Sequence, residues 1–394
     1  MKWEKVKLAD ICEVITKGTT PSNIGAEFIG EGIKYIRSEM LTSSKYIADE
    51  GFLYIDENTH CKLKRSQLKA GDILFSMAGA YLGKTAILRE CDVPANTNQA
   101  VALIRVTLEE FNREYVYYYL NLPEVIKSVN SITGQAAQPN INLKQIGNIQ
   151  ILLPPKEKQD AIAFVLSTYD NLIENNQKQI KLLEEAAQRL YKEWFVDLRF
   201  PGHENVKIVD GIPEGWMRER LVDLVDVQYG YAFDGSLFNT AKNGMPIIRI
   251  RNIPSGNTGD YTTEEADSQY VIHNGDILVG MDGEFHFNSW SGPDAYLVQR
   301  TCSFRPHNSE MRGYLLQAIH APIKYFENTV VGATVAHLGK KHIDTINVLT
   351  CPTNLYVPFQ SYYERRQLLL NQNWLLAEAR DRLLPKLMSG EIEV

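Results

Sequence analysis

Residues 71–85, GDILFSMAGAYLGKT, end in the Gly-Lys-Thr triplet of a phosphate-binding loop. Such a loop needs its first glycine five positions before Gly83, so that successive backbone N–H groups can surround the phosphates. That position holds Ala78, and Gly79 comes one residue too late. The spacing therefore disfavours a nucleotide site. A nucleotide-binding enzyme stays open as one class of function, which a titration of the chain with ATP would test.

No other motif in the sequence supplies a catalytic constellation. The signatures of zinc proteases (H-E-x-x-H), serine hydrolases (G-x-S-x-G) and dinucleotide enzymes (G-x-G-x-x-G) are absent. The 8 histidines are dispersed and the 5 cysteines include no C-x-x-C pair, so neither a metal site nor a disulfide framework is expected. We predict a chain that does no catalysis of its own and binds no metal.

The same features indicate a cytoplasmic protein. No apolar run approaches the roughly 18 residues of a membrane span. The opening MKWEKVKLAD lacks the apolar core of a signal peptide. Scattered, unpaired cysteines also suit a reducing compartment.

Two polar loops have a composition that suits the reading of DNA. Residues 134–150 hold seven Asn/Gln, one Lys and no acid, whereas residues 332–348 hold His337, Lys340 and Lys341. Amide side chains pair bidentately with adenine edges, and basic side chains hold phosphates. The net charge of −7 argues against a chain that coats nucleic acid through charge alone, but a local basic surface is compatible with it. Polar loops without a ligand explain the composition equally well.

Candidate DNA-contacting residues come from these loops and from the ends of the β-type runs. Residues 33–89 are locally basic, with nine Lys/Arg against six Asp/Glu. In the first half of the chain the candidates are Arg37, Lys84, Asn98, Gln99, Gln135, Gln138, Asn140 and Asn142. In the second half they are Arg249, Arg251, Asn252, His286, Asn288, Arg300, His337, Lys340 and Lys341.

The sequence contains an internal repeat, with two related copies in tandem. GDILFSMAG at 71–79 recurs as GDILVGMDG at 275–283, and WEKVKLADI at 3–11 recurs as WMRERLVDL at 216–224. Further matches near residues 33, 146 and 182 keep the same order in the second half. Collinear matches of this kind indicate a tandem duplication. The Gly-Asp-Ile-Leu element is repeated but the Gly-Lys-Thr triplet is not, so the shared feature is a turn before a buried strand.

Each half ends in a long helical segment. Each half begins with about 150 residues rich in short β-type runs, and proline separates these runs from the helical segment. The apolar positions alternate three and four apart, as in a coiled-coil seam. The seam positions are Leu166, Ile173, Asn176, Ile180, Leu183, Leu190 and Trp194 in the first helix and Leu369, Leu376 and Leu383 in the second. Asn176 either fixes the register of the helices or is merely tolerated there.

These features together resemble the specificity (S) subunit of type I restriction-modification enzymes. The resemblance rests on the W-x4-L openings, the two Gly-Asp-Ile-Leu elements, and the passage ILLPPKEKQDAI (151–162) into a helix. GIPEGW (211–216) and LLPKLMSGEI (383–392) match the same family, and the match covers essentially the whole chain. The second copy departs from the pattern at 351–360, CPTNLYVPFQ, which leaves the start of its helix open.

The resemblance implies an α/β (α+β) fold with target-recognition domains at residues 1–155 and 201–352. Long helices at 156–200 and 353–394 would pack as an antiparallel coiled-coil spacer between them. Each domain would read one half of a bipartite, asymmetric DNA site, without catalysis by this chain.

The resemblance also implies partners. Two modification subunits, which are adenine methyltransferases using S-adenosylmethionine, and two ATP-driven restriction subunits would dock on the chain. S-adenosylmethionine, ATP and Mg would then lie in the partner subunits, and none would bind here directly. The alternative is a protein-binding scaffold, bridged by the same coiled coil, that has no DNA specificity.

Overall fold

The computed structural model describes residues 3–42, 44–49, 51–106, 110–132, 139–329 and 336–394. Contacts divide the chain into two compact units. Unit 1 comprises Met1–Leu172 and Leu376–Val394, and unit 2 comprises Ile173–Leu375. Both units mix short strands and helices, as expected from the sequence. The domain boundaries at residues 155, 200 and 352 stay predictions.

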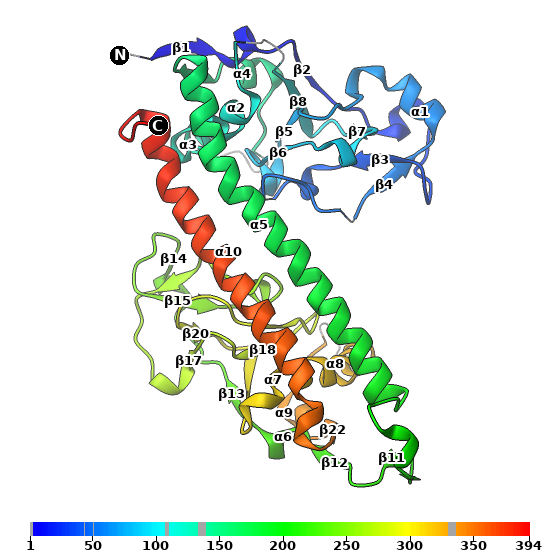
Figure 1. The fold of residues 1–394 in the computed structure, drawn as a ribbon. Coiled ribbons are helices and arrows are strands. Elements are labelled where there is room, and N and C mark those ends of the chain that lie inside the picture. The colour runs from blue at the N-terminus through cyan, green and yellow to red at the C-terminus, as the bar shows by residue number, and fades with distance from the viewer. Residues whose placement is uncertain (1–2, 43, 50, 107–109, 133–138, 330–335) are drawn as a thin grey trace. The chain divides into compact units, whose positions relative to one another are not determined.

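Unit 1 is built from small sheets (Figure 1). Its strands are β1 (Glu4–Lys7), β2 (Val14–Lys17), β3 (Ile33–Ile36), β4 (Leu53–Ile55), β5 (Ile73–Ser76), β6 (Thr85–Ile87), β7 (Ala95–Thr97), β8 (Val101–Arg105) and β9 (Gln150–Leu153). One antiparallel sheet has the order β2-β8-β5-β6. A second has the order β4-β3-β7, with β3 parallel to β7, and β1 pairs with β9.

Short helices cover the sheets of unit 1. They are α1 (Glu57–Lys62), α2 (Arg113–Leu120), α3 (Pro123–Ile132) and α4 (Leu143–Gly147). The first part of α5 (Lys156–Tyr191) and the last part of α10 (Val357–Ser389) complete the unit. α2 buries a tyrosine-rich face, and Tyr115 donates a hydrogen bond to the carbonyl oxygen of Leu152 at 2.6 Å. That bond ties α2 to the strand from which α5 departs.

Unit 2 repeats this plan with extra strands. Its strands are β10 (Ile208–Val209), β11 (Ile212–Pro213), β12 (Met217–Arg220), β13 (Val225–Tyr229), β14 (Phe238–Asn239), β15 (Met245–Ile248), β16 (Tyr261–Thr262), β17 (Val271–Ile272), β18 (Ile277–Gly280), β19 (Phe287–Ser289), β20 (Ala295–Leu297), β21 (Thr301–Pro306) and β22 (Asn347–Thr350). Its short helices are α6 (Leu221–Leu224), α7 (Arg312–Ala318), α8 (His320–Thr329) and α9 (Lys340–Ile343).

The strand orders of the two units correspond. β13-β21-β18-β19 in unit 2 matches β2-β8-β5-β6 in unit 1, and β12-β22 matches β1-β9. The parallel pair β15-β20 likewise matches β3-β7. Tyr314 also donates to the carbonyl of Leu349, as Tyr115 does to Leu152. The topology is therefore duplicated along with the sequence.

The repeated Gly-Asp-Ile-Leu element leads into an inner strand of the four-stranded sheet in each unit. Gly71 and Gly275 have φ of 84° and 88°, a left-handed conformation that glycine adopts without strain. Both strands that follow, β5 and β18, are buried along their whole length. The buried aspartate between turn and strand forms an ion pair with a half-buried arginine on the neighbouring strand. Arg105 Nη2 lies 2.6 Å from Asp72, and Arg305 Nη2 lies 2.8 Å from Asp276.

The Gly-Lys-Thr triplet belongs to a hairpin. Ser76 N donates to the Lys84 carbonyl at 2.8 Å, and Gly83 N donates to the Ser76 carbonyl at 3.0 Å. Thr85 then starts β6, where a phosphate loop would start a helix. The segment therefore lacks the helix N-terminus that a phosphate cradle requires.

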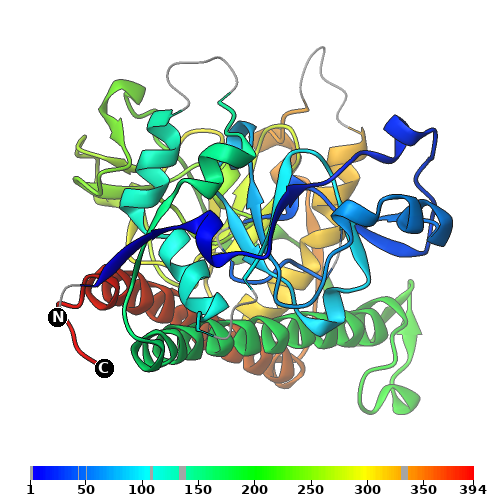
Figure 2. The same ribbon diagram turned by 90° about the horizontal axis from the view of Figure 1, so that it is seen from above.

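The two long helices contribute to both units. α5 has 36 residues and is followed by a π-helical turn at Lys192–Val196, and α10 has 33 residues. α10 begins at Val357, after a 3-10 turn at Thr353–Leu355, which lies within the stretch where the sequence departs from the family pattern. Both figures show the end of α10 (red) beside the start of α5 (green) in unit 1 (Figures 1 and 2).

Within each unit the two helices run antiparallel. In unit 1, Asp170 of α5 pairs with Arg380 of α10, and Lys158 near the start of α5 pairs with Glu393, which follows the end of α10. In unit 2, Asn176 contacts Asn373 and Glu184 pairs with Arg366. Among the described residues, no helix has the length and apolar composition that crossing a membrane requires.

We expect Asp72→Ala to destabilise unit 1 strongly. The carboxylate is 1% exposed and the Arg105 side chain 15% exposed, so the substitution leaves a half-buried guanidinium without its partner, which we expect to cost about 3 kcal/mol. Thermal unfolding of the full chain measures the effect. Asp223→Ala, which removes an exposed pair with Arg220, is the matched control and should leave the melting temperature nearly unchanged. Equal losses in the two variants would contradict the role given to Asp72.

Candidate nucleic-acid interface

In both units three segments meet at one end of the inner strands of the four-stranded sheet: the residues after the Gly-Asp-Ile-Leu strand, the turn before the neighbouring strand, and the segment before α4 or α9. We call this place the sheet edge. In unit 1, Met77 N donates to the Ala100 carbonyl at 2.8 Å, and Ile141 N donates to the Met77 carbonyl at 2.9 Å. In unit 2, Met281 N donates to the Arg300 carbonyl at 2.9 Å, and Leu338 N donates to the Met281 carbonyl at 2.7 Å. Side chains next to these bonds therefore occupy equivalent places in the two units.

In unit 1 this edge carries amides around a hollow of about 580 Å³. The predicted residues Gln99, Asn140 and Asn142 line it, together with Lys17 and Lys144. We call these five residues the amide surface. Residues from β2, the β7–β8 turn and the start of α4 thus come together from distant parts of the sequence. The arrangement suits hydrogen bonding to base edges with cations nearby.

The amides differ in how far they are already engaged. Asn142 caps α4, because its Oδ1 accepts from Gln145 N at 2.9 Å and its backbone N donates to Gln145 Oε1 at 2.9 Å. Gln99 Oε1 accepts from the Thr20 hydroxyl, which leaves the Gln99 amide nitrogen available. Asn140 is exposed, and its side chain makes no hydrogen bond to the described residues, although its backbone pairs with Ala78. Asn140 is therefore the amide best placed to pair with a base.

In unit 2 the same edge carries charged residues. Asp282 Oδ1 lies 2.5 Å from His337 Nδ1, and Asp282 Oδ2 lies 3.3 Å from Arg300 Nη1. Lys340 and Lys341 begin α9 three residues after His337. We call Asp282, Arg300, His337, Lys340 and Lys341 the basic surface. The predicted residues Arg300, His337, Lys340 and Lys341 thus gather at one edge, opposite in character to the amides of unit 1.

Other candidates are engaged elsewhere. Asn98 Oδ1 accepts from Ala100 N, Asn252 Oδ1 accepts from Arg249 N, and His286 lies 3.3 Å from Glu284. Arg37 pairs with Glu39 at 2.8 Å, and Arg251 pairs with Asp260 at 2.6 Å. Arg249 lies over the Phe238 ring, and Lys84 is half-buried beside the hairpin. Gln135 and Gln138 lie outside the described residues. DNA contact by all these residues stays a prediction.

Asn288 belongs to the interface with α10. Its Oδ1 accepts from Arg366 Nη2 at 2.7 Å, and its amide nitrogen donates to the Pro254 carbonyl at 3.0 Å. Arg366 also donates to the Ser289 hydroxyl and pairs with Glu184, each at 2.6 Å. The side chain of Asn288 therefore holds a helix against the sheet of unit 2.

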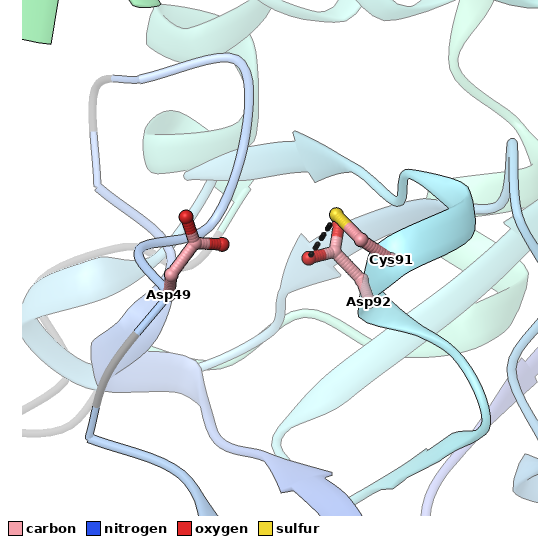
Figure 3. Close-up of side chains that lie close together, drawn as sticks. All are labelled: Asp49, Cys91 and Asp92. Carbon is pink, nitrogen blue, oxygen red and sulfur yellow. Dashed lines mark hydrogen bonds between the residues drawn. The ribbon is translucent and has the colours of Figure 1, made fainter. Parts of the chain in front are cut away.

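Asp49, Cys91 and Asp92 lie close enough together to suggest a cation site (Figure 3). Arg89 already occupies the place between the carboxylates, with Nη2 at 2.7 Å from Asp49 and 2.9 Å from Asp92. A fixed positive charge there repels a metal ion. Asp49 and Asp92 are therefore better described as two carboxylates that share ion pairs with Arg89.

The predicted seam positions are either buried or half-buried. Leu166, Asn176, Ile180 and Leu369 are buried, and Ile173, Leu183, Leu190, Trp194, Leu376 and Leu383 are half-buried. In unit 2, Asn176 Nδ2 donates to Asn373 Oδ1 at 2.9 Å, so this polar residue has a partner on the facing helix. A paired amide in an apolar seam penalises shifted registers, because a shift would bury it unpaired.

Unit 1 has its own polar anchor between the helices. Asp170 is buried and accepts hydrogen bonds from the Tyr118 hydroxyl and from Arg380 Nη1, each at 2.5 Å. Burial by itself lowers the pKa of Arg380, but the Asp170 and Asp381 carboxylates outweigh burial and hold that pKa above its usual value. Burial and the Asp170 charge both raise the pKa of Tyr118. The guanidinium of Arg380 therefore stays charged, and the phenol of Tyr118 stays neutral.

Several of these residues were not expected from the sequence. Asp282 stands opposite Ala78 in the aligned repeats GDILVGMDG and GDILFSMAG, so a comparison of the repeats could have flagged it. Lys17 had no such signal, because only pairing of β2 with β8 brings it to the amide surface. Asp170 and Arg380 are 210 residues apart and meet only through helix packing.

Comparison with known proteins gives consistent matches along the chain. The family model described as type I restriction modification DNA specificity domain matches residues 1–185 and 213–354. The chain is 27% identical over 413 residues to the type I restriction enzyme MjaIX specificity subunit of Methanocaldococcus jannaschii, covering 100% of this chain and 94% of the relative. It is 30% identical over 297 residues to the MjaVIII specificity subunit of that organism, covering 71% and 64%.

A solved structure has the same fold. The S subunit of a type I restriction-modification system from M. genitalium matches with a TM-score of 0.56 at 15% identity. The match covers 98% of this chain and 96% of that chain. The two-domain α/β architecture with long helices, which the sequence predicted, is confirmed by this likeness.

We expect Ile180→Asp to destabilise unit 2. Ile180 is 8% exposed in the seam, so the substitution buries a carboxylate without a partner, at a cost of about 3 kcal/mol or more. The control is Leu182→Asp on the same helix, where the side chain is 65% exposed and the charge stays solvated. Chemical denaturation of both variants compares them. Similar midpoints would mean that the seam does not stabilise the unit.

Proposed function

Because the chain belongs to the type I restriction-modification DNA specificity family, we propose that it is the subunit that selects the DNA target. Each unit reads one half of a bipartite target, and the bases between the halves go unread. The observation that carries this proposal is the repeated sheet edge. The same hydrogen-bonded frame presents amides in unit 1 and charged residues in unit 2.

The chemistry of the two surfaces supports an asymmetric target. Amide groups suit adenine, and arginine suits guanine, so surfaces of different composition select different bases. A dimeric repressor with identical surfaces reads a palindrome. A chain with two related but unlike surfaces reads two unlike half-sites. The net charge of −7 further indicates that partner subunits supply much of the charge that binds phosphates.

The long helices are the proposed docking region for partner subunits. Large apolar side chains stand exposed along them, and a partner that covered these side chains would remove apolar surface from water. In unit 1 these are Phe164 and Leu172, and in unit 2 they are Leu182, Leu368 and Leu375. Two methyltransferase subunits dock here, and two ATP-dependent restriction subunits join them for cleavage.

The chain itself does no catalysis in this proposal. S-adenosylmethionine, ATP and Mg²⁺ bind to the partner subunits. Burial raises the pKa of Cys12 and of Cys351 to about 12, so these thiols are poor nucleophiles at neutral pH. The hairpin geometry of residues 73–87 likewise favours a chain without a nucleotide site.

A selection from random duplex DNA tests the proposal against a scaffold without DNA specificity. The full chain, with its methyltransferase subunits, is expected to enrich one bipartite sequence, and its affinity should fall steeply with salt. A scaffold would assemble with the same partners yet enrich no sequence. Binding of ATP to the chain alone would instead support a nucleotide enzyme.

Exchange of one domain should change one half-site. Replacing residues 1–155 by the matching domain of a relative is expected to alter the bases read by unit 1, because each unit has its own core and its own surface. Mapping of methylated sites in cells provides the measurement. The reciprocal exchange of residues 201–352 serves as the control. If one exchange changes both half-sites, the units do not read separately.

Lengthening both helices should lengthen the unread spacer. One heptad inserted after Leu172 and another after Leu375 fall between the units, so contacts within each unit are kept. Seven residues add roughly 10 Å of helix, which is about three base pairs of B-DNA. We expect unchanged half-sites and a longer spacer by methylation mapping. An active variant with the original spacer would show that the helices do not set it.

A further inference from the structure

We propose that Arg300 is the side chain through which unit 2 selects a guanine, an inference that rests on the proposed function. Arg300 is the last of the three residues between β20 and β21. Its counterpart in unit 1 is Ala100, because the Ala100 carbonyl accepts from Met77 N as the Arg300 carbonyl accepts from Met281 N. Ala100 and the preceding Gln99 line the hollow of the amide surface. Unit 2 therefore carries a long cationic side chain where unit 1 carries the methyl group of Ala100 beside Gln99.

The backbone at Arg300 is strained in a way that its counterpart is not. Arg300 has φ of 69°, in the left-handed region that is unfavourable for a residue with a side chain. Ala100 is not among the residues with positive φ. Glycine or asparagine usually occupies such a turn position. An arginine held there at an energetic cost points to a use for its side chain.

Asp282 leaves one edge of the guanidinium available. The carboxylate engages Nη1 alone, at 3.3 Å, and the side chain of Arg300 remains 58% exposed. Among the described residues the Arg300 side chain makes no other hydrogen bond or ion pair, so Nε and Nη2 can still donate as a pair. Two parallel donors match the O6 and N7 acceptors that guanine presents in the major groove.

Asp282 is itself held in place. His337 Nδ1 lies 2.5 Å from Asp282 Oδ1, and the backbones of these two residues form an isolated antiparallel bridge. Gly283 N also donates to the Ala336 carbonyl at 3.0 Å. A fixed carboxylate fixes the direction of the arginine. Direction matters for reading a base but little for attracting a phosphate, which Lys340 and Lys341 can do as point charges.

The test maps methylated sites for the full chain with its methyltransferase subunits. The half-site of unit 2, identified by exchange of residues 201–352, should contain a guanine whose preference is lost in Arg300→Ala. Affinity for the wild-type site should fall roughly 10- to 100-fold. In Arg300→Gln the same position should shift from guanine toward adenine, because an amide pairs with adenine N6 and N7. The half-site of unit 1 should stay unchanged.

Two further variants separate reading from structure. Arg300→Gly relieves the positive φ, so it should match or exceed the wild-type melting temperature while losing the guanine preference. A merely structural arginine would not show this combination. Arg220→Ala is the matched control, because Arg220 is 57% exposed and pairs with Asp223 in the same unit. It should keep the wild-type target.

Other results would overturn the inference. A uniform loss of affinity with a shallower salt dependence and unchanged base preferences would make Arg300 a phosphate contact. A unit 2 half-site without guanine, or a change confined to the unit 1 half-site, would also refute it. A wild-type complex that selects no sequence at all would instead refute the proposed function and remove the basis of this inference.

Discussion

The ion pair of the buried aspartate in each Gly-Asp-Ile-Leu element sets the geometry on which both units depend. The left-handed glycine turns the chain so that the next aspartate accepts from the backbone, as Asp72 does from Lys69 N at 2.7 Å. The same carboxylate binds Arg105 through Nε at 2.7 Å and Nη2 at 2.6 Å. The hydrogen bond to Asp72 holds the pKa of Arg105 above its usual value. A charge pair of this kind, with a buried carboxylate, tolerates one strand register, because any shift would separate the charges.

That register determines what appears at the sheet edge. β5 and β8 must align for Met77 to bond to the Ala100 carbonyl, and the same alignment in unit 2 places Met281 against Arg300. The frame is made of backbone and buried side chains, so the residues next to it can vary without disturbing the core. Ala78 and Asn140 in unit 1 correspond to Asp282 and His337 in unit 2. Separation of a shared frame from variable side chains is what a protein with two related reading surfaces needs.

The long helices use polar residues for a different purpose. Asp170 with Arg380 in unit 1, and Asn176 with Asn373 in unit 2, are paired groups within otherwise apolar packing. Such groups add little net stability, since desolvation offsets most of the attraction. They do penalise every register in which they would be unpaired. In unit 2 the network of Arg366 with Ser289 and Asn288 adds a direct connection between helix and sheet.

The sequence by itself determined the duplication, the helix seams and the family, because these depend on residue order and periodicity. Repeated Gly-Asp-Ile-Leu turns and apolar residues at alternating spacing need no knowledge of contacts. The candidate site could be predicted only in part. Gln99, Asn140, Arg300 and His337 were expected as separate polar residues, but their assembly at equivalent edges required strand pairing between segments far apart in sequence. Asn142 and Asn288 looked like the other amides, yet the structure engages one as a helix cap and the other with Arg366. Tertiary structure decided these points, because a hydrogen bond depends on the distance between side chains, which composition does not contain.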